Sequence, residues 1–543
     1  MTAERAFTPF ERVLALVTRV RAGEGRTVAL YGAHVFLILF AYYIFRSVRE
    51  GLLLESGSAA RGSYATAVIA ALLMVLVPVY GVVRRRYDGA RLVNAIIAFF
   101  ITTLVVFWLA ARAGADVAFA FYVWVGIFNV MMIAQFWALA ADSFNVKTGQ
   151  RLFPAIMLAA QLGALCGAQF TESTTGMLGT NNLLLVGTVL LLLTASFTGL
   201  MRETVPAGSR SVRSNGDEEP HRPFGGFQVI AASRYLALIA LMIVLINWIS
   251  STGDFIHRDF VKRHFDAVAA ATAASTRDLV TAYMANFFFW MIVLQLVIQV
   301  FVVGRLFRML GVATALLIPA ALSLIGYAAV GFLPLLTLIR MVRMGEQSIE
   351  YSLTNTLRQA LFLPTTRAET YEGKTAIETF FWRFGDLVQA GVVFAGTTWL
   401  GMDARGFALL NALLAGFWIA VAFAIGRHYR ELAARNLTNA APQLTRPIPH
   451  AEWHPDEPFE HALPRDLFVD HDPGDVLTLS AQRHDGSPLP DWLRFDARRH
   501  RFHGVASEVE ESEIVVQVVA TDHDGVSVSG TFVIRRRVAI AGG

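Results

Sequence analysis

The sequence predicts a polytopic α-helical membrane protein that ends in a small all-β domain, and three observations predict it. Of its 543 residues, 55% are hydrophobic and only 16% are charged, which is more apolar side chain than a soluble core of this length uses. The apolar residues form runs of about twenty residues, the length that spans a bilayer. Beyond about residue 436, these runs give way to short alternating segments bounded by Gly, Asp and Pro.

The N-terminal segment, residues 1–27, is amphipathic. Its stretch FERVLALVTRV carries arginines on its polar side, which is typical of a helix in the membrane interface. The first long apolar run begins near Tyr31 and is longer than the apolar core of a signal peptide. We therefore expect an amphipathic cytoplasmic N-terminus and no cleaved signal. The net charge of +4 is small and dispersed, so we expect no nucleic-acid partner.

The apolar runs divide into six and six around a charged, Pro/Gly/Ser-rich central loop at residues 202–227. The first half, residues 28–201, has runs that begin near Tyr31 and continue near 64–83, 91–111, 117–140, 152–172 and 182–201. The second half, residues 228–430, has runs near 228–250, 279–303, 311–331, 333–356, 378–400 and 405–426. About twelve transmembrane helices in two such halves form the major facilitator fold, in which substrate lies between the halves. A linker at 431–457 then leads to a β-sandwich over residues 458–537.

The Lys and Arg residues predict the orientation, because they gather in loops on the cytoplasmic side. They lie in the even-numbered loops, in the central loop and after the last span, at Arg84, Arg85, Arg86, Arg91, Lys147, Arg151, Arg202, Arg210, Arg213, Arg222, Arg305, Arg308, Arg427, Arg430 and Arg435. Both termini are therefore expected in the cytoplasm, with the chain in a bacterial inner membrane. The external loop predicted at 251–278 differs, because it mixes Arg258, Lys262, Arg263 and Arg277 with Asp254, Asp259, Asp266 and Asp278.

Ionisable side chains inside a span are costly, so each is a candidate site residue. In the first span, Arg46 and Arg49 are three residues apart and Arg46 and Glu50 four apart, so all three lie on one side of a helix. Two guanidinium groups beside one carboxylate suit an anionic substrate, since Arg donates in pairs to phosphate or carboxylate oxygens. The alternative is that both Arg side chains extend to water or lipid headgroups at the external end.

The tenth span carries the largest intramembrane charge cluster: Arg340, Arg343, Glu346 and Glu350 follow at helical offsets of three, three and four. Arg343 can pair with Glu346 or Glu350, and such pairs can exchange as the two halves move. The alternative is a fixed ladder of salt bridges that stabilises one conformation. Both interpretations stay open.

Six further residues complete the candidate site. Lys374 precedes the eleventh span, and Arg383 and Asp386 lie on it; these are assigned to substrate binding together with the two clusters. Asp142, Arg151 and Glu172 are assigned to coupling or gating, with Asp142 expected to pair with Arg151 or Lys147. Gly373-Lys374 lies in no Walker-type motif, so ATP hydrolysis is not expected. Because the spans show no metal-ligand spacing and no nucleophile–base pair, we expect neither enzyme activity nor a cofactor.

Three segments resemble the ATP/ADP translocase (nucleotide exchange transporter) family over residues 28–430: YYIFRSVREGLLL, FWALAADSFNVKTGQRLFP and YEGKTAIETFFWRFGD. In that family, a Lys-Asp pair in the first span and a Gly-Lys-Ala-like segment before the eleventh help to hold the nucleotide. Arg49-Glu50 and Gly373-Lys374 match those positions. Arg differs from Lys in its planar, forked geometry. The resemblance therefore implies a major facilitator-like fold and an anionic cargo, with nucleotide specificity less strongly implied.

Residues 458–537 resemble a dystroglycan-type cadherin-like (Ig-like) domain, chiefly through LPDWLRFD, with Trp492 expected in the core, and VVATDHDG. Its aspartates are weak calcium candidates: Asp470, Asp472, Asp475, Asp522 and Asp524. Turn formation is the favoured interpretation of these residues, because Asp and Gly favour tight strand connections and cadherin-type sites form between tandem domains. We expect no resident metal, and a protein or glycan as the type of partner for this domain.

The sequence as a whole predicts a secondary active transporter in contact with membrane lipid, which moves a small anionic solute, such as a nucleotide or other phosphorylated compound, by exchange or with protons. The alternative is a membrane sensor or scaffold, in which the helical part binds a ligand and the β-domain engages a partner.

Overall fold

The computed structural model describes residues 8–14, 18, 20–21, 24–86, 89–144, 146–203, 225–366, 369–438, 441–455, 457–470, 476–506, 512–522 and 525–537. The chain divides into two compact units. The first comprises Met1–Leu361 and Glu372–Arg427, and the second Phe362–Tyr371 and His428–Gly543. The first unit is helical, whereas the second contains the β-strands.

The N-terminal half of the helical unit follows a short helix, α1 (Pro9–Leu14). Its six long helices are α2 (Gly25–Ser56), α3 (Ala60–Arg86), α4 (Gly89–Arg112), α5 (Ala118–Ser143), α6 (Val146–Leu178) and α7 (Thr180–Glu203). Helices α2 and α6 pack closely because Gly163 and Gly167 are four residues apart on α6. A Cβ at either glycine would overlap the backbone of Phe36 or Phe40 on α2. Small residues at this spacing let membrane helices approach each other.

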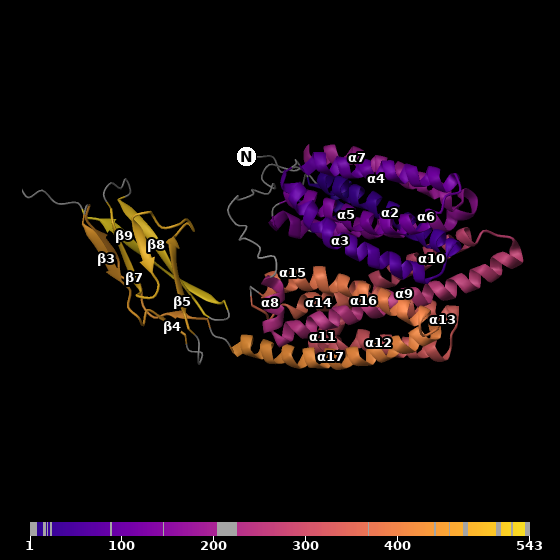
Figure 1. Ribbon diagram of the computed structural model, residues 1–543. Helices are drawn as coiled ribbons and strands as arrows, with labels where there is room; N and C mark the ends of the chain where they lie inside the picture. The colour runs from indigo at the N-terminus through magenta and orange to yellow at the C-terminus, as the bar shows by residue number, and fades with distance from the viewer. Residues whose placement is uncertain are drawn as a thin grey trace, which may run out of the picture. The chain divides into compact units, whose positions relative to one another are not determined.

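The C-terminal half runs from α8 to α17 (Figure 1). Its elements are α8 (Gly225–Ala232), α9 (Arg234–Thr272), α10 (Thr276–Val297), π-helical turn η2 (Ile298–Val302), α11 (Val303–Ala315), α12 (Leu317–Phe332), α13 (Leu336–Ile349), π-helical turn η3 (Glu350–Thr354), α14 (Asn355–Leu361), π-helical turn η4 (Glu369–Gly373), α15 (Lys374–Ala376), π-helical turn η5 (Ile377–Phe381), α16 (Trp382–Thr398) and α17 (Ala404–Thr438). Within α11, Gly311 has φ 69° and ψ 171° and is not helical. It forms the turn between the eighth and ninth predicted spans.

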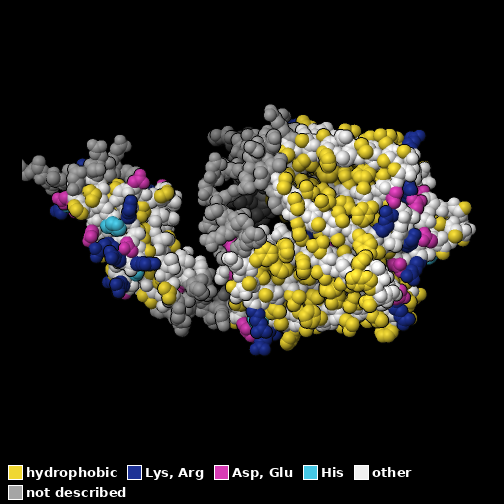
Figure 2. Space-filling model, in the orientation of Figure 1, with side chains coloured by type: hydrophobic (Ala, Val, Ile, Leu, Met, Phe, Trp, Pro, Cys, Tyr) yellow, Lys and Arg dark blue, Asp and Glu magenta, His cyan; other side chains and the backbone are white. Residues whose placement is uncertain are grey.

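Nine helices of the described part of the chain are long and apolar enough to cross a membrane. The other three predicted spans are α12, with 16 residues, and the segments α13–α14 and α15–α16, each interrupted by a π-helical turn. Figure 2 shows hydrophobic side chains over most of the visible face of this unit, with Lys, Arg, Asp and Glu gathered at its edges. The predicted polytopic helical architecture is confirmed.

One predicted loop is wrong. Residues 251–272 continue α9, a helix of 39 residues, which at 1.5 Å per residue is about 58 Å long and exceeds the bilayer core of about 30 Å. The far end of α9 projects beyond its neighbours (Figure 1). Two ion pairs at i,i+4 spacing, Lys262–Asp266 and Arg263–Asp259, lie along it. Charged residues taken for a loop are therefore the end of a helix.

The second unit is a β-sandwich, as predicted. A four-stranded sheet has the order β2-β9-β8-β5 and a three-stranded sheet the order β3-β7-β6, with a small β1-β4 pair. The strands are β1 (Gln443–Leu444), β2 (Ala451–Trp453), β3 (Pro458–Ala462), β4 (Phe468–Val469), β5 (Thr478–Arg483), β6 (Leu493–Asp496), β7 (Arg501–Val505), β8 (Glu513–Thr521) and β9 (Ser527–Arg536). Alternate residues of β8 are buried, which is the pattern of a strand with one face in the core.

The domain begins earlier than predicted. Strands β1 and β2 come from the segment assigned to the linker, and β2 pairs in parallel with β9. The fully buried tryptophan is Trp453 on β2, whereas Trp492 is half-buried against it, with ring centroids 5.5 Å apart. The Pro-rich composition of residues 431–457 hid a strand of only three residues.

Candidate functional site

Arg343 on α13 is a fully buried guanidinium. Its Nη2 lies 2.6 Å from Asp254 Oδ1 on α9, and its Nη1 lies 2.5 Å from Glu346 Oε2 one turn along α13. Nη1 also donates to the Tyr327 hydroxyl at 3.2 Å, and this hydroxyl in turn donates to Glu346. Gly253 leaves room for these contacts, because a Cβ there would lie 2.6 Å from Nη1. These residues form the Arg343 cluster, in which two carboxylates compensate one buried charge.

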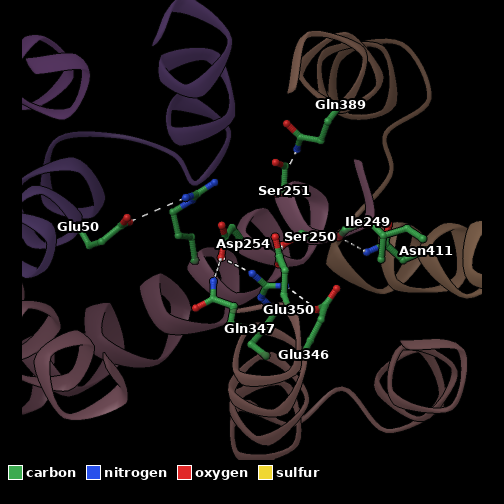
Figure 3. Close-up of polar contacts among 12 residues, drawn as sticks. Glu50, Ile249, Ser250, Ser251, Asp254, Glu346, Gln347, Glu350, Gln389 and Asn411 are labelled. Carbon is green, nitrogen blue, oxygen red and sulfur yellow. Dashed lines mark hydrogen bonds and ion pairs between the residues drawn. The ribbon is translucent and has the colours of Figure 1, made fainter. Parts of the chain in front are cut away.

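The Asp254 side chain is 41% exposed, although it lies within the bundle. Gln347 Nε2 donates to its Oδ1 at 3.1 Å. Figure 3 shows Asp254 beside Gln347, with Glu50 approaching from the other half of the molecule. The Arg343 cluster therefore presents one carboxylate to open space within the helical unit.

Arg46 on α2 has different surroundings. Only 8% of the residue is exposed, and its Cζ lies 4.1 Å from the ring centroid of Phe288 on α10. Its Nη1 donates to the Tyr43 hydroxyl at 3.4 Å. Asp254 acts on it electrostatically, yet among the described residues no carboxylate lies within ion-pair distance of Arg46. The side chain is thus held inside the helical unit.

Arg49 and Glu50 join the two halves. Arg49 Nε lies 3.4 Å from Glu50 Oε1, and its Cζ lies 4.2 Å from the Tyr122 ring centroid on α5. From the other half, Arg258 Nη1 reaches the Tyr122 hydroxyl at 3.1 Å and Glu50 Oε2 at 4.0 Å. A Cβ at Gly62 on α3 would lie 2.7 Å from Arg258 Cζ, so the glycine makes room for this guanidinium. One carboxylate is therefore shared by two guanidinium groups.

A second polar chain crosses the halves. Glu172 on α6 accepts a hydrogen bond of 2.8 Å from Asn286 Nδ2 on α10. The Oδ1 of the same amide accepts from Arg340 on α13, whose Cζ lies 5.0 Å from the Tyr283 ring centroid. Asn286 thus connects Glu172 to Arg340, two residues that the sequence assigned to different roles.

The halves are joined at the end of the bundle where α2 stops. Arg277 Nε donates to Glu55 Oε2 at 2.6 Å, and its Nη1 donates to Asn181 Oδ1 at 2.7 Å. Beside this pair, the Thr180 hydroxyl donates to Asp278 Oδ1 at 2.6 Å. We call these five residues the end clamp.

Two predicted site residues, Glu350 on η3 and Asp386 on α16, contact the middle of α9. The Ser250 hydroxyl donates to Glu350 Oε2 at 2.9 Å, and the Ser251 hydroxyl donates to Asp386 Oδ1 at 2.9 Å. Arg383 lies 3.9 Å from Asp386 on the same helix. Hydroxyl groups, and not the Arg343 cluster, supply the hydrogen bonds to these two carboxylates.

Lys374 and Arg151 contact other partners. Lys374 Nζ donates to Gln359 Oε1 at 2.6 Å. Arg151 forms a two-point contact with Glu24, at 2.9 and 2.6 Å, a partner that the sequence did not suggest. The side chain of Asp142 lies outside the described residues, so its expected pairing stays a prediction.

The calcium candidates are only partly described, because Asp472, Asp475 and Asp524 lie outside the described residues. Asp522 Oδ1 accepts from the backbone N–H of Val526 at 2.8 Å, across a turn in which Gly525 has φ 87°. This is the geometry that turn formation requires. Among the described residues, which include Asp470, no three His, Cys, Asp or Glu side chains are grouped to hold a metal.

Four site residues were missed: Asp254, Arg258, Asn286 and Tyr122. The two charged residues were assigned to a loop, although the buried Phe255, Ile256 and Val261 around them continue the helical pattern of α9. That periodicity was the available signal. Nothing local marks Asn286 or Tyr122, because their roles depend on partners more than a hundred residues away.

Comparisons with known proteins agree with this architecture. Residues 441–537 match the family model described as "Putative Ig domain". No curated protein matches the chain. Among solved structures, a mutant of the nucleoside transporter NupG aligns with a TM-score of 0.56 at 12% identity, covering 74% of this chain and 98% of that one. A bacterial homologue of the iron transporter ferroportin, in an inward-facing state, aligns with a TM-score of 0.55 at 12% identity, with coverage of 74% and 98%.

A third solved structure is a bacterial homologue of the lysosomal transporter Spinster, inward-facing and unoccupied, with a TM-score of 0.52, 12% identity, and coverage of 75% of this chain and 98% of that one. Likenesses at this identity establish the fold alone. The chain is therefore an integral membrane protein whose helical unit has the major facilitator fold, with an Ig-like domain at its C-terminal end.

Proposed function

We propose that the chain is a secondary transporter that moves a small anionic solute across the membrane by alternating access. The proposal rests on the positive charge of Arg46, which is uncompensated among the described residues. A guanidinium within the membrane-spanning part is costly unless an anion compensates it, and no described carboxylate lies within ion-pair distance. A solute carboxylate or phosphate supplies the missing partner, since both accept paired hydrogen bonds from Arg.

The surroundings of Arg46 support this role. The cation lies over the Phe288 ring, which belongs to the other half, so an anion bound at Arg46 lies close to the contact between the halves. Arg49 is the second candidate contact. Arg49 and Arg258 share the single carboxylate of Glu50, so these three side chains together keep a positive charge. A solute bound here influences the relative position of the halves, as alternating access requires.

The conformation supports an inward-facing state. The end clamp closes one end of the bundle, and the ferroportin and Spinster homologues to which this chain is similar are themselves inward-facing. Most loop Lys and Arg residues belong to the opposite end, which the positive-inside rule assigns to the cytoplasm. Lys374, in the segment before α16, is the cation that we assign to attracting the solute at this entrance.

A ligand screen tests the proposal. Purified full-length protein is heated with nucleotides, sugar phosphates or carboxylates, because a compound that binds the native state raises its apparent stability. We expect one anionic class to stabilise the unmodified protein. Arg61→Ala is the matched control, because it removes a surface arginine paired with Asp116, and it should be stabilised equally. Arg46→Ala should lose the response. An equal response in Arg46→Ala contradicts the assignment. Nucleotide specificity, which the resemblance alone implies, requires that ATP or ADP stabilises more than sugar phosphates.

A sensor or scaffold is the second candidate, because the Ig-like unit is compact and has its own core. Deleting residues 436–543 separates the two functions. Transport that persists without the tail makes the domain accessory. Loss of a cellular response, in a protein that shows no flux with or without the tail, favours the sensor.

A further inference from the structure

A separate cavity lies inside the C-terminal half, between α9, α12, α13 and α17. Its volume is about 290 Å³. Apolar side chains with large exposed fractions surround its mouth: Leu322 at 47%, Ile325 at 65% and Met341 at 72%. Side chains of this kind on a membrane-spanning unit face lipid, so the cavity opens to the bilayer.

Two carboxylates, Glu346 and Glu350, line the cavity. Glu346 is paired with Arg343 at 2.5 Å. Glu350 accepts from the Ser250 hydroxyl, but no Lys, Arg or His in the described part of the chain lies within 4.0 Å of it. A carboxylate in an apolar cavity without a cation is costly.

A residue beside this cavity also carries an unsatisfied polar group. Trp418 on α17 lines the cavity and is only 4% exposed. Its indole N–H has no acceptor among the described residues, whereas a buried tryptophan usually finds one. Gly345 adds room, because a Cβ there would meet no atom within 4 Å.

We propose that this cavity binds a small lipophilic ammonium compound that enters from the membrane. The ammonium group pairs with Glu350, and the apolar part covers the walls. The site goes beyond the anion transport proposed above, because its ligand is a cation and its entrance faces lipid. It shares α13 with the Arg343 cluster, so an occupant contacts the helix that carries that cluster.

The test uses full-length protein in phosphatidylcholine nanodiscs, with octylammonium as the probe and octanol and octanoate as controls. We expect octylammonium to raise the unfolding temperature saturably, by about 2 °C or more, because it binds only the native state. Octanol and octanoate should not. Gly345→Leu, which fills the cavity, and Glu350→Gln, which removes its charge, should abolish the rise. Gly416→Leu on α17 is the matched control, because its Cβ also meets open space but lies outside the cavity; it should keep the rise.

Two results overturn this site. An equal rise with octanol means that apolar partitioning alone acts, and a rise that persists in Gly345→Leu means that the probe binds elsewhere. If Glu350→Gln fails to fold, Gly345→Leu still decides, since it leaves every charge in place. Neither result bears on anion transport, because Arg46 does not line this cavity.

Discussion

At the scale of single residues, Asp254 is expected to contribute to the stability of the bundle. It pairs with the fully buried Arg343, yet its own side chain is 41% exposed to the interior. Asp254→Asn should lower the free energy of unfolding by about 1–3 kcal/mol, because Arg343 keeps Glu346 but loses one charged hydrogen bond. Thermal unfolding in detergent measures this. Asp266→Asn is the control, because it removes a carboxylate from an ion pair in which Asp266 is 46% exposed, and it should cost under about 1 kcal/mol. Equal losses would argue against a special role for Asp254.

His461 makes the β-domain sensitive to acid. Burial lowers the pKa of this imidazole, which stacks on Phe532 with ring centroids 5.2 Å apart. Because the folded pKa lies below the unfolded value of about 6.5, the neutral form stabilises the fold above that pH, and the stabilisation is lost as the pH falls through it.

Hydrogen exchange in full-length protein, corrected for the pH dependence of the intrinsic exchange rate, should therefore show lower protection factors in β9 at pH 5.5 than at pH 7.5. His461→Phe keeps the aromatic stack and should remove most of that difference. A difference that persists unchanged in His461→Phe assigns the effect to other histidines.

At the scale of elements, the end clamp connects α2 and α7 to α10. Arg277→Ala should weaken the closed end, because Glu55 and Asn181 lose their shared partner. Spin labels at Ser58 and Ala274, in a protein with Cys166 replaced by Ala, report the separation of the halves there. We expect a longer distance distribution in Arg277→Ala and no change in Arg263→Ala, which removes a pair within α9. An unchanged distance distribution in Arg277→Ala would contradict the proposal that the end clamp holds the two halves together.

The turn between the eighth and ninth spans depends on Gly311. Its φ of 69° is a conformation that other residues adopt at a cost, and no side chain crowds the position. Gly311→Ala should therefore destabilise by about 1–3 kcal/mol through the backbone alone, because φ 69° with ψ 171° is a region essentially confined to glycine. Gly304→Ala, at a helical glycine that also faces open space, should stabilise by up to about 1 kcal/mol. Thermal unfolding of both variants checks the opposite signs, and the same sign in both would contradict this interpretation.

The sequence predicts elements better than it predicts their partners. Each span is a local property, a run of about twenty apolar residues, so all twelve helical segments are predicted. The length of α9 is not predicted, because the charged residues near its end resemble those of a loop. The cluster on α13 and η3 is predicted from helical spacing, with Glu346 and Glu350 as the two alternative partners of Arg343, of which Glu346 forms the ion pair. The surroundings of Arg46 are not predicted from the sequence, because Phe288 and Tyr43 meet only when α10 packs on α2.

At the scale of the whole helical unit, the proposed transport depends on where charge is compensated. Arg343, Arg258 and Arg277 have carboxylates within ion-pair distance, so they hold helices together. Arg46 has none among the described residues and lies against both halves. This contrast is the reason that we propose solute binding for Arg46 and structural roles for Arg343, Arg258 and Arg277.

Uptake into proteoliposomes tests that central claim most directly. Full-length protein is reconstituted, and uptake of the anionic compound that stabilises it best is measured with unmodified protein, Arg46→Ala, Arg46→Lys and Arg61→Ala. We predict uptake that Arg46→Ala lowers at least about tenfold, a loss expected for one charged hydrogen bond, with partial retention in Arg46→Lys and full retention in Arg61→Ala. Uptake by Arg46→Ala at the unmodified rate would contradict the account.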